Sequence, residues 1–313
     1  MWRRIFRWIV GSVIVSFIIK HSKRIIIPGF EKLPIYNVAG FFWNGIIKGA
    51  VTMRASAVSF SFFLAIFPSI IFVFTLIPFI PIDHFQDQLL DLLRNFIPGS
   101  AYEAARETIE DIVKHQHGSL LSIGFISALY FSTNGFNTLI TAFNNTHHTI
   151  ETRTFLQQQV VSFFLVIIST FLLLIAIVLI IGSELALDKI FRKGEFLFYL
   201  VQSGRWVIVF ALFYFLISFT FFLGPSRKSG WKFASAGSMV ATILSILTSL
   251  GFAFYINHFG TYNKLYGSIG TLIIILLWIY FNSLVVLLGF DLNVSILKAK
   301  RDKESLQDPV PFP

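Results

Sequence analysis

Six long apolar stretches dominate this sequence and limit what it can fold into. Each is close to the roughly 20 residues that a helix needs to cross about 30 Å of hydrocarbon. Because hydrocarbon satisfies no backbone hydrogen bond, the stretches are expected to be helical. The second and fifth carry many Ser, Thr and Asn residues, so hydropathy alone indicates them less clearly. The six candidate membrane helices are residues 55–80, 120–143, 155–181, 206–223, 233–256 and 269–292.

The composition agrees with a membrane protein. Hydrophobic residues make up 55% of the chain and charged residues 13%, whereas a soluble domain carries charges on about a quarter of its residues. The chain has no Cys, which excludes thiol catalysis and thiolate metal sites. Disordered and fibrous chains have different compositions. The predicted fold class is therefore an all-α polytopic membrane protein.

Residues 1–53 are expected to hold interfacial helices and not a further span. Residues 5–19 are mostly apolar, but a helix of this length is only about 22 Å long. A signal peptide would continue into a small-residue cleavage site, whereas a basic segment follows at residues 20–24. Residues 36–49 combine aromatic and aliphatic side chains with a lysine. We predict that both segments lie at the cytoplasmic interface, with a loop as the alternative for the second.

Basic residues are distributed unevenly between the two sides that six alternating spans would create. Seventeen of the 25 Lys and Arg residues fall on the side that carries both termini. The positive-inside rule therefore predicts that both termini are cytoplasmic. This topology already explains the net charge of +9, so we expect no nucleic-acid partner.

The longest connection, residues 81–118, is predicted to form a helical hairpin outside the cytoplasm. Asp83 and Ser100 each begin a capping-box pattern, with a Gln or Glu three residues later. The connection has seven acids against three bases, which fits an outward-facing segment packed on the rim of the membrane domain. The six-span membrane domain is assigned to residues 54–297. The charged and then Pro-rich tail, residues 298–313, is expected to be disordered.

Polar side chains form stripes inside three of the spans. Asn134, Asn137 and Asn144 share one face of the second span, Asn282 and Asn293 share one face of the sixth, and a Ser/Thr stripe follows the fifth. A polar side chain in hydrocarbon must find a partner or a wet cavity. The stripes therefore predict either a lined cavity or hydrogen-bonded helix interfaces, and the sequence leaves both open.

Three ionisable residues stand near the ends of spans: Arg54, Glu184 and Asp291. Arg54 at the start of the first span and Asp291 near the end of the sixth would lie at similar cytoplasmic depth. This predicts an ion pair, either direct or through a substrate head group. In the alternative, Arg54 reaches lipid phosphate and Asp291 is hydrated at a helix end. We expect the pair and the Asn stripes to line a polar cavity that opens toward the cytoplasmic leaflet. Pro68 predicts a kink in the first span, acting as a hinge or as fixed shape.

Metal and catalytic motifs are weak in this sequence. The close His pairs, His115 with His117 and His147 with His148, have no carboxylate at ligand spacing. The chain has no P-loop, no Gly-x-Ser-x-Gly motif and no Gly-x-Gly-x-x-Gly motif. We therefore expect no metal, no cofactor, no ATP-driven pump and no enzymatic activity.

Several short motifs recur in a fixed order along the chain: Arg54-Ala55-Ser56-Ala57, Phe67-Pro68, Ser122-Ile123-Gly124, Gly135-Phe136, Asn144, Glu151-x-Arg153, Tyr266-Gly267-Ser268-Ile269-Gly270, Trp278-Ile279-Tyr280 and Gly289-Phe290-Asp291-Leu292-Asn293. In order and spacing over residues 33–297 they resemble the YihY/virulence factor BrkB family, formerly labelled ribonuclease BN-like. The resemblance implies a six-span bacterial inner-membrane protein, associated in some relatives with serum resistance or envelope lipid transport. Relatives commonly carry Glu where Asp291 stands and Tyr residues where residues 59–61 stand. The ribonuclease label gains no support here, since a metal nuclease needs a His/Asp cluster.

Two functions follow as hypotheses. A transporter or flippase-like carrier would move a lipid or other amphiphile along the polar interior, with membrane lipids as partners. A structural or regulatory membrane protein would use the same stripes to hold its helices together. The sequence does not indicate the substrate, the coupling ion or the oligomeric state.

Overall fold

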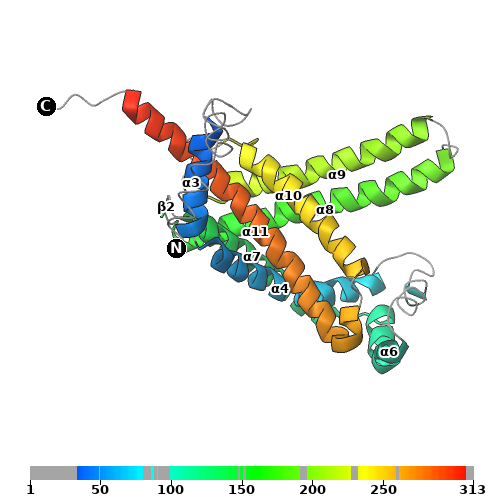
Figure 1. Cartoon of the computed structure of the whole chain (residues 1–313). Helices are drawn as coiled ribbons and strands as arrows, with labels where there is room; N and C mark the ends of the chain where they lie inside the picture. Colours follow the sequence, from blue (N-terminus) through cyan, green and yellow to red (C-terminus); the bar gives the residue numbers. More distant parts are fainter. Residues whose placement is uncertain are drawn as a thin grey trace.

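The structure is a computed structural model that describes residues 34–48, 50–79, 86–87, 90, 99–146, 149–150, 153–190, 196–226, 232–258 and 261–307. Long helices form nearly all of it (Figure 1). The elements are α3 (Ile35–Lys48), α4 (Val51–Leu76), the 3-10 turn η1 (Ile77–Phe79), α6 (Gly99–Lys114), α7 (Gly118–Asn144), β1 (Asn145–Thr146), β2 (Thr149–Ile150), α8 (Phe155–Ile190), α9 (Phe196–Leu223), α10 (Ala236–His258) and α11 (Thr261–Gln307). The two short strands pair antiparallel between α7 and α8.

Helices α4 and α7 form a closely packed pair because small residues line their contact. A Cβ on Gly124 would meet the Phe72 backbone nitrogen at 3.1 Å, and a Cβ on Gly135 would meet the Phe62 ring at 2.9 Å. Glycine at these two positions lets the helices approach as small residues do in membrane bundles. Pro68 is buried inside α4, and the helix continues through it to Leu76.

A second pair is formed by α10 and α11, and α11 also packs against α4 and α3. Val38 of α3 is buried against Ile296 and Ala299 of α11. Residues 36–48 of the predicted interfacial segment are helical, whereas residues 1–33 and 49 lie outside the described part of the chain.

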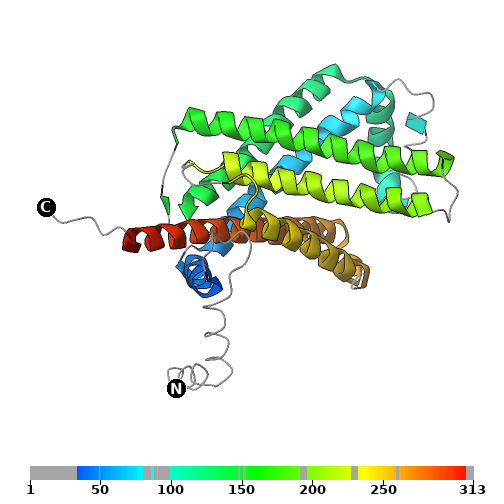
Figure 2. The same cartoon turned by 90° about the horizontal axis from the view of Figure 1, so that it is seen from above.

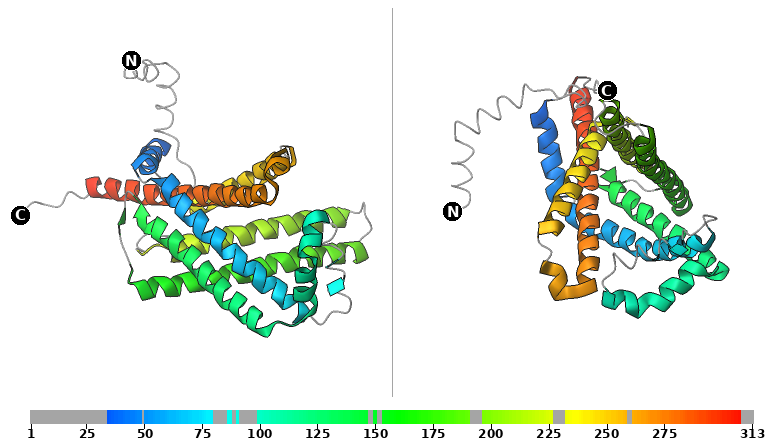
Figure 3. Two further views of the ribbon diagram at one scale, coloured as in Figure 1. Left: turned by 90° about the horizontal axis from the view of Figure 1, so that it is seen from below. Right: turned by 90° about the vertical axis from the view of Figure 1, so that its right-hand side faces the viewer.

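The third pair, α8 and α9, diverges from α10 and α11. All three pairs meet where α7 ends and α8 begins, and we call this the closed end of the bundle (Figures 1 and 3). At the opposite end, where α8 leads into α9, the pair stands apart from α10 and α11, and we call this the open end. Figure 2 shows α8 and α9 lying side by side along their length. Helix α6 lies at the open end.

Aromatic side chains fill the centre of the bundle near the closed end. Phe143 of α7 stacks on Phe290 of α11, with ring centroids 4.0 Å apart. Phe221 of α9 meets both rings edge-on, with centroids 5.6 Å away. All three are almost fully buried. Aromatic pairs of this kind stabilise a core beyond the area they bury. The cluster therefore joins one helix of each pair, namely α7, α9 and α11, at one point.

The chain is an all-α polytopic membrane protein, as the sequence predicts. Among the described residues, five segments have the length and hydropathy to cross a membrane: Val51–Phe79, Phe155–Ile180, Ser203–Leu223, Ala236–Ile256 and Gly270–Lys303. Helix α7 is not among them, because its polar stripe lowers its hydropathy, although it packs between α4 and α8. The sixth span therefore stays a prediction.

The helix predicted in the second half of residues 81–118 is present, whereas the disorder predicted from residue 298 is not found over the described residues. Helix α6 supplies the second helix of the predicted hairpin, and Val113 packs with Ile77 and Leu90 beside the end of α4. Most of the first hairpin helix lies outside the described residues. The disordered tail predicted from residue 298 is wrong over residues 298–307, because α11 continues to Gln307. Packing of α11 on α3 and a run of good helix formers explain this extension.

Candidate functional site

Arg54 and Asp291 form an ion pair between α4 and α11. Arg54 Nη2 lies 2.6 Å from Asp291 Oδ2, and Arg54 Nη1 lies 3.3 Å from Asp291 Oδ1. Arg54 Nη1 also donates to the carbonyl oxygen of Ala142 on α7, at 2.9 Å. The side chains are 10% and 4% exposed. The predicted direct pair is thus present, and it ties three helices together through a bidentate contact that suits guanidinium and carboxylate.

Asn293 lies two residues beyond Asp291 on α11 and bonds to the start of α10. Its Oδ1 accepts from the Gly237 backbone N–H at 2.7 Å, and its Nδ2 donates to Ser235 Oγ at 2.7 Å. The contact is possible because Gly237 and Gly289 let the two backbones cross at close range. Asn293 therefore satisfies a backbone N–H in the first turn of α10, which has no partner inside its own helix.

Asn144 and Arg153 join the end of α7 and the start of α8 to the end of α9. Asn144 Oδ1 accepts from the Ser226 backbone N–H at 2.9 Å. Arg153 donates to the carbonyls of Leu223, Gly224 and Pro225, at 3.0, 2.8 and 2.5 Å. These carbonyls are the unsatisfied acceptors at the C-terminal end of a helix, where a cation is favoured. Burial lowers the pKa of Arg153 from its ordinary value.

The other predicted site residues face elsewhere. Asn137 Oδ1 accepts from Gln158 Nε2 on α8, and the same nitrogen lies 2.9 Å from Thr141 Oγ1. Asn282 donates back to the Trp278 carbonyl of its own helix, at 2.9 Å. Asn134 is half-buried on α7, and its carbonyl accepts from a side chain of its own helix.

The structure therefore does not bring all the predicted polar residues to one cavity. Arg54 and Asp291 meet directly, Asn144 and Asn293 bond to neighbouring helix ends, and Asn137 turns toward α8. Buried aromatic rings occupy the region beside the ion pair. A helical stripe fixes which residues share a face, but not which neighbouring helix covers each part of that face. At the closed end, the described polar groups serve mainly to join helices.

Three residues that the sequence reasoning did not single out take part in these contacts: Gln158, Ser226 and Ser235. Gln158 belongs to a run of three glutamines in the first turns of an otherwise apolar helix. An amide there is costly unless it has a partner, and this signal was available in the sequence. Ser226 and Ser235 stand in a connection that gives no such signal.

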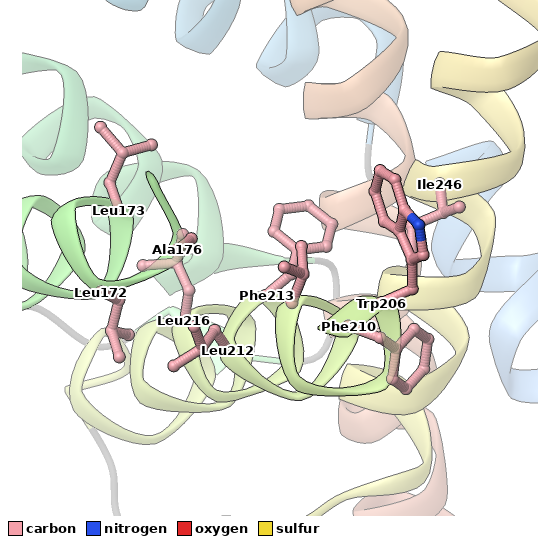
Figure 4. A pocket seen from close by; sticks show the side chains of 10 residues that line it. Leu172, Leu173, Ala176, Trp206, Phe210, Leu212, Phe213, Leu216 and Ile246 are labelled. Carbon is pink, nitrogen blue, oxygen red and sulfur yellow. The ribbon is translucent and has the colours of Figure 1, made fainter. Parts of the chain in front are cut away.

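An apolar cleft of about 500 Å³ opens between the α8–α9 pair and α10. Leu172, Leu173 and Ala176 of α8 line one side, and Ile246 of α10 lies beside Trp206 on the other (Figure 4). The remaining lining residues come from α9: Val209, Phe210, Leu212, Phe213 and Leu216. The lining side chains carry almost no polar atoms, so the cleft suits a hydrocarbon chain and not a polar solute.

The described residues show no group of three His, Asp or Glu side chains placed to hold a metal ion. Fold and site together define an integral membrane protein whose polar groups join helices at one end and whose apolar cleft lies near the middle of α8, α9 and α10. The chain belongs to the family described as Virulence factor BrkB, which it matches over residues 42–311.

Relatives of this chain have names of two kinds. It is 30% identical over 251 residues to the ribonuclease-like protein YfkH of Bacillus subtilis, covering 79% of this chain and 90% of that one. It is 27% identical over 281 residues to UPF0761 membrane protein Smlt0865 of Stenotrophomonas maltophilia, covering 86% of this chain and 63% of that one. A UPF0761 membrane protein of Alteromonas mediterranea is 24% identical over 288 residues, covering 88% of this chain and 92% of that one. No solved structure matches.

Proposed function

We propose that this chain is a bacterial inner-membrane carrier that moves a lipid or other amphiphile between leaflets, with both termini in the cytoplasm. The observation that carries the proposal is the apolar cleft between α8, α9 and α10. Its lining residues belong to these three helices, and Figure 3 shows the α8–α9 pair diverging from α10 and α11. An acyl chain would occupy this cleft, since apolar side chains form nearly all of its lining.

The closed end supplies the other half of the proposal. Arg54, Asp291, Asn144 and Asn293 hold α4, α7, α10 and α11 to their neighbours there by hydrogen bonds and an ion pair. A carrier needs one end to open while the other is closed, and interfaces held by a few polar contacts can exchange partners. In this proposal the closed end faces the cytoplasm, and Pro68 in α4 is the hinge residue.

A reconstitution assay tests the carrier. The purified protein is placed in liposomes that contain a phospholipid with a fluorescent head group, and a membrane-impermeant quencher reports how fast inner-leaflet lipid reaches the outer leaflet. We expect quenching beyond half of the label, at a rate that rises with protein content. Leu173→Trp places a ring in the cleft and should slow this exchange several-fold. Leu174→Trp is the matched control, because Leu174 is similarly exposed on the same helix but does not line the cleft.

A structural or regulatory envelope protein is the second candidate, and a specific observation favours it. Asn293, Asn144 and Arg153 use their polar groups to hold helix ends, as packing contacts would. Exchange no faster than in protein-free liposomes, with folded protein confirmed by circular dichroism, would overturn the carrier and favour this candidate. Equal exchange by the two Trp variants would overturn the assignment of the cleft as the pathway.

A further inference from the structure

A second cleft, of about 470 Å³, lies at the closed end beside the start of α8. Its lining has two parts. Arg153, Gln157 and Ser226 supply polar groups, while Leu156, Val160 and Val161 supply an apolar wall along α8. Figure 2 shows the first turns of α8 running beside the last turns of α9. A ligand that fits both parts must be polar at one end and apolar along the rest.

Two hydrogen-bond donors without partners among the described residues lie at or behind the polar part: Ser226 lines it, and Asn144 lies behind Ser226 and does not line it. Asn144 is 6% exposed, and its buried Nδ2 has no partner in the described part of the chain. The same holds for the buried hydroxyl of Ser226, whose backbone N–H is bonded to Asn144. Arg153 donates three hydrogen bonds to backbone carbonyls, whereas a guanidinium has five N–H donors. Buried donors without partners are costly, so a ligand rich in acceptor oxygens is favoured here.

The charge of the site has the sign that an anion requires. No carboxylate of the described residues is paired with Arg153. Burial already lowers the pKa of Arg153, since desolvation disfavours its charged form. The N-terminal end of α8 adds partial positive charge and unbonded backbone N–H groups. A nearby anion would offset both the desolvation and the unpaired donors.

From this arrangement we propose that the cleft binds the phosphate group of a membrane phospholipid, with an acyl chain along Leu156, Val160 and Val161. The phosphate oxygens accept from Arg153 and Ser226, the two residues of the lining that can donate to them beside Gln157. The inference goes beyond the carrier, because such a site binds lipid whether or not the protein transports it. It concerns a different cleft from the one between α8, α9 and α10.

Native mass spectrometry of the full chain in detergent tests this site with three probes. Dioleoylphosphatidylglycerol carries the phosphate and the chains, dioleoylglycerol carries the chains alone, and inorganic phosphate carries the head-group anion alone. We expect phosphatidylglycerol to bind at least about tenfold more tightly than either other probe, since each part of the cleft then contributes. Equal binding of dioleoylglycerol would overturn the phosphate site. Inorganic phosphate binding as tightly as the lipid would replace the lipid with free phosphate.

Two variants leave the Arg153 contacts to α9 in place. Ser226→Ala removes a hydroxyl that has no partner among the described residues, so the protein should stay folded while phosphatidylglycerol binding weakens about three- to tenfold. Val160→Phe fills the apolar part and should weaken binding about tenfold. Ser122→Ala and Val178→Phe are the matched controls, because both residues are exposed and neither lines this cleft. Unchanged phosphatidylglycerol binding by both Ser226→Ala and Val160→Phe would overturn the site, whatever the carrier assay shows.

Discussion

The side chains of Arg54 and Asp291 stand 237 positions apart in the sequence and 2.6 Å apart in the structure. Each lies on a different long helix, and the pair is nearly buried. Taking two charges out of water costs several kcal/mol per ion, which a bidentate contact and a further hydrogen bond must offset. The carbonyl of Ala142 provides that further bond. The pair therefore fixes how α4, α7 and α11 lie against each other.

Removing one partner of this pair should be costly. Asp291→Leu leaves the Arg54 guanidinium buried without a counter-charge, and we expect it to destabilise the protein by about 3–5 kcal/mol. The charge reversal Arg54→Asp with Asp291→Arg should recover part of the loss of either single reversal. Recovery is partial because Asp at position 54 cannot donate to Ala142. Thermal unfolding in detergent measures all four proteins of the cycle.

An exposed ion pair is the control for that cycle. Arg106 and Glu110 pair at 2.8 Å on the surface of α6, with side chains 54% and 37% exposed. Reversing Arg106 should cost far less than reversing either member of the buried pair, because exposed ion pairs contribute little to stability. Strictly additive losses in the Arg54 and Asp291 cycle would show that the two residues are not coupled.

The crossing of α10 and α11 depends on glycine. A Cβ on Gly289 would lie 2.6 Å from the Ala241 Cβ and 2.7 Å from the Gly237 carbonyl oxygen. Gly289→Ala should therefore push the helices apart and cost about 1–3 kcal/mol. Gly251→Ala, on α10, has nothing within 4 Å of the added Cβ and should be neutral or slightly stabilising. Equal melting temperatures for the two variants would contradict this account.

Two asparagines of α11 should differ in what their removal costs. Asn293→Ala strips partners from the Gly237 N–H and from Ser235 Oγ, both at an interhelical contact, so we expect a loss of about 1–3 kcal/mol. Asn282→Ala removes a hydrogen bond to its own helix. It should cost only a few tenths of the free energy of unfolding that Asn293→Ala costs. Denaturant titration in mixed micelles compares the two. A larger loss from Asn282→Ala would point to a role for that residue that the structure does not show.

Much of the architecture follows from local sequence patterns. Long apolar runs, the need to satisfy backbone groups in lipid, and the charged flanks are enough to predict helices near the observed positions. The pairing of Arg54 with Asp291 was also predictable, because two opposite charges at one depth have few other partners in hydrocarbon. The length of α11 was not, since Ile296 and Ala299, where the extension begins, pack on Val38 of α3, and a contact between distant segments cannot be read from local sequence.

The partner of each residue in the polar stripes was harder to predict, for a physical reason. Asn137 and Asn144 share a helical face, yet one contacts Gln158 of α8 and the other contacts Ser226 beyond α9. Face sharing is a property of one helix, whereas the partner is set by how neighbouring helices cross. The crossing of α10 and α11 in turn depends on the close approach of Gly237 and Gly289, which no periodicity in the sequence specifies.

The orientation of the bundle in the membrane is the last prediction. His115 follows α6 at the open end, and Lys303 stands in the exposed last turns of α11 beyond the closed end (Figure 1). Because basic residues gather on the side of both termini, that side should be cytoplasmic. The chain has no Cys, so His115→Cys and Lys303→Cys each carry a single thiol. An impermeant maleimide applied to spheroplasts should label the first variant directly and the second after permeabilisation. The reverse pattern would place the closed end outside and would also reverse the direction in which the proposed carrier opens.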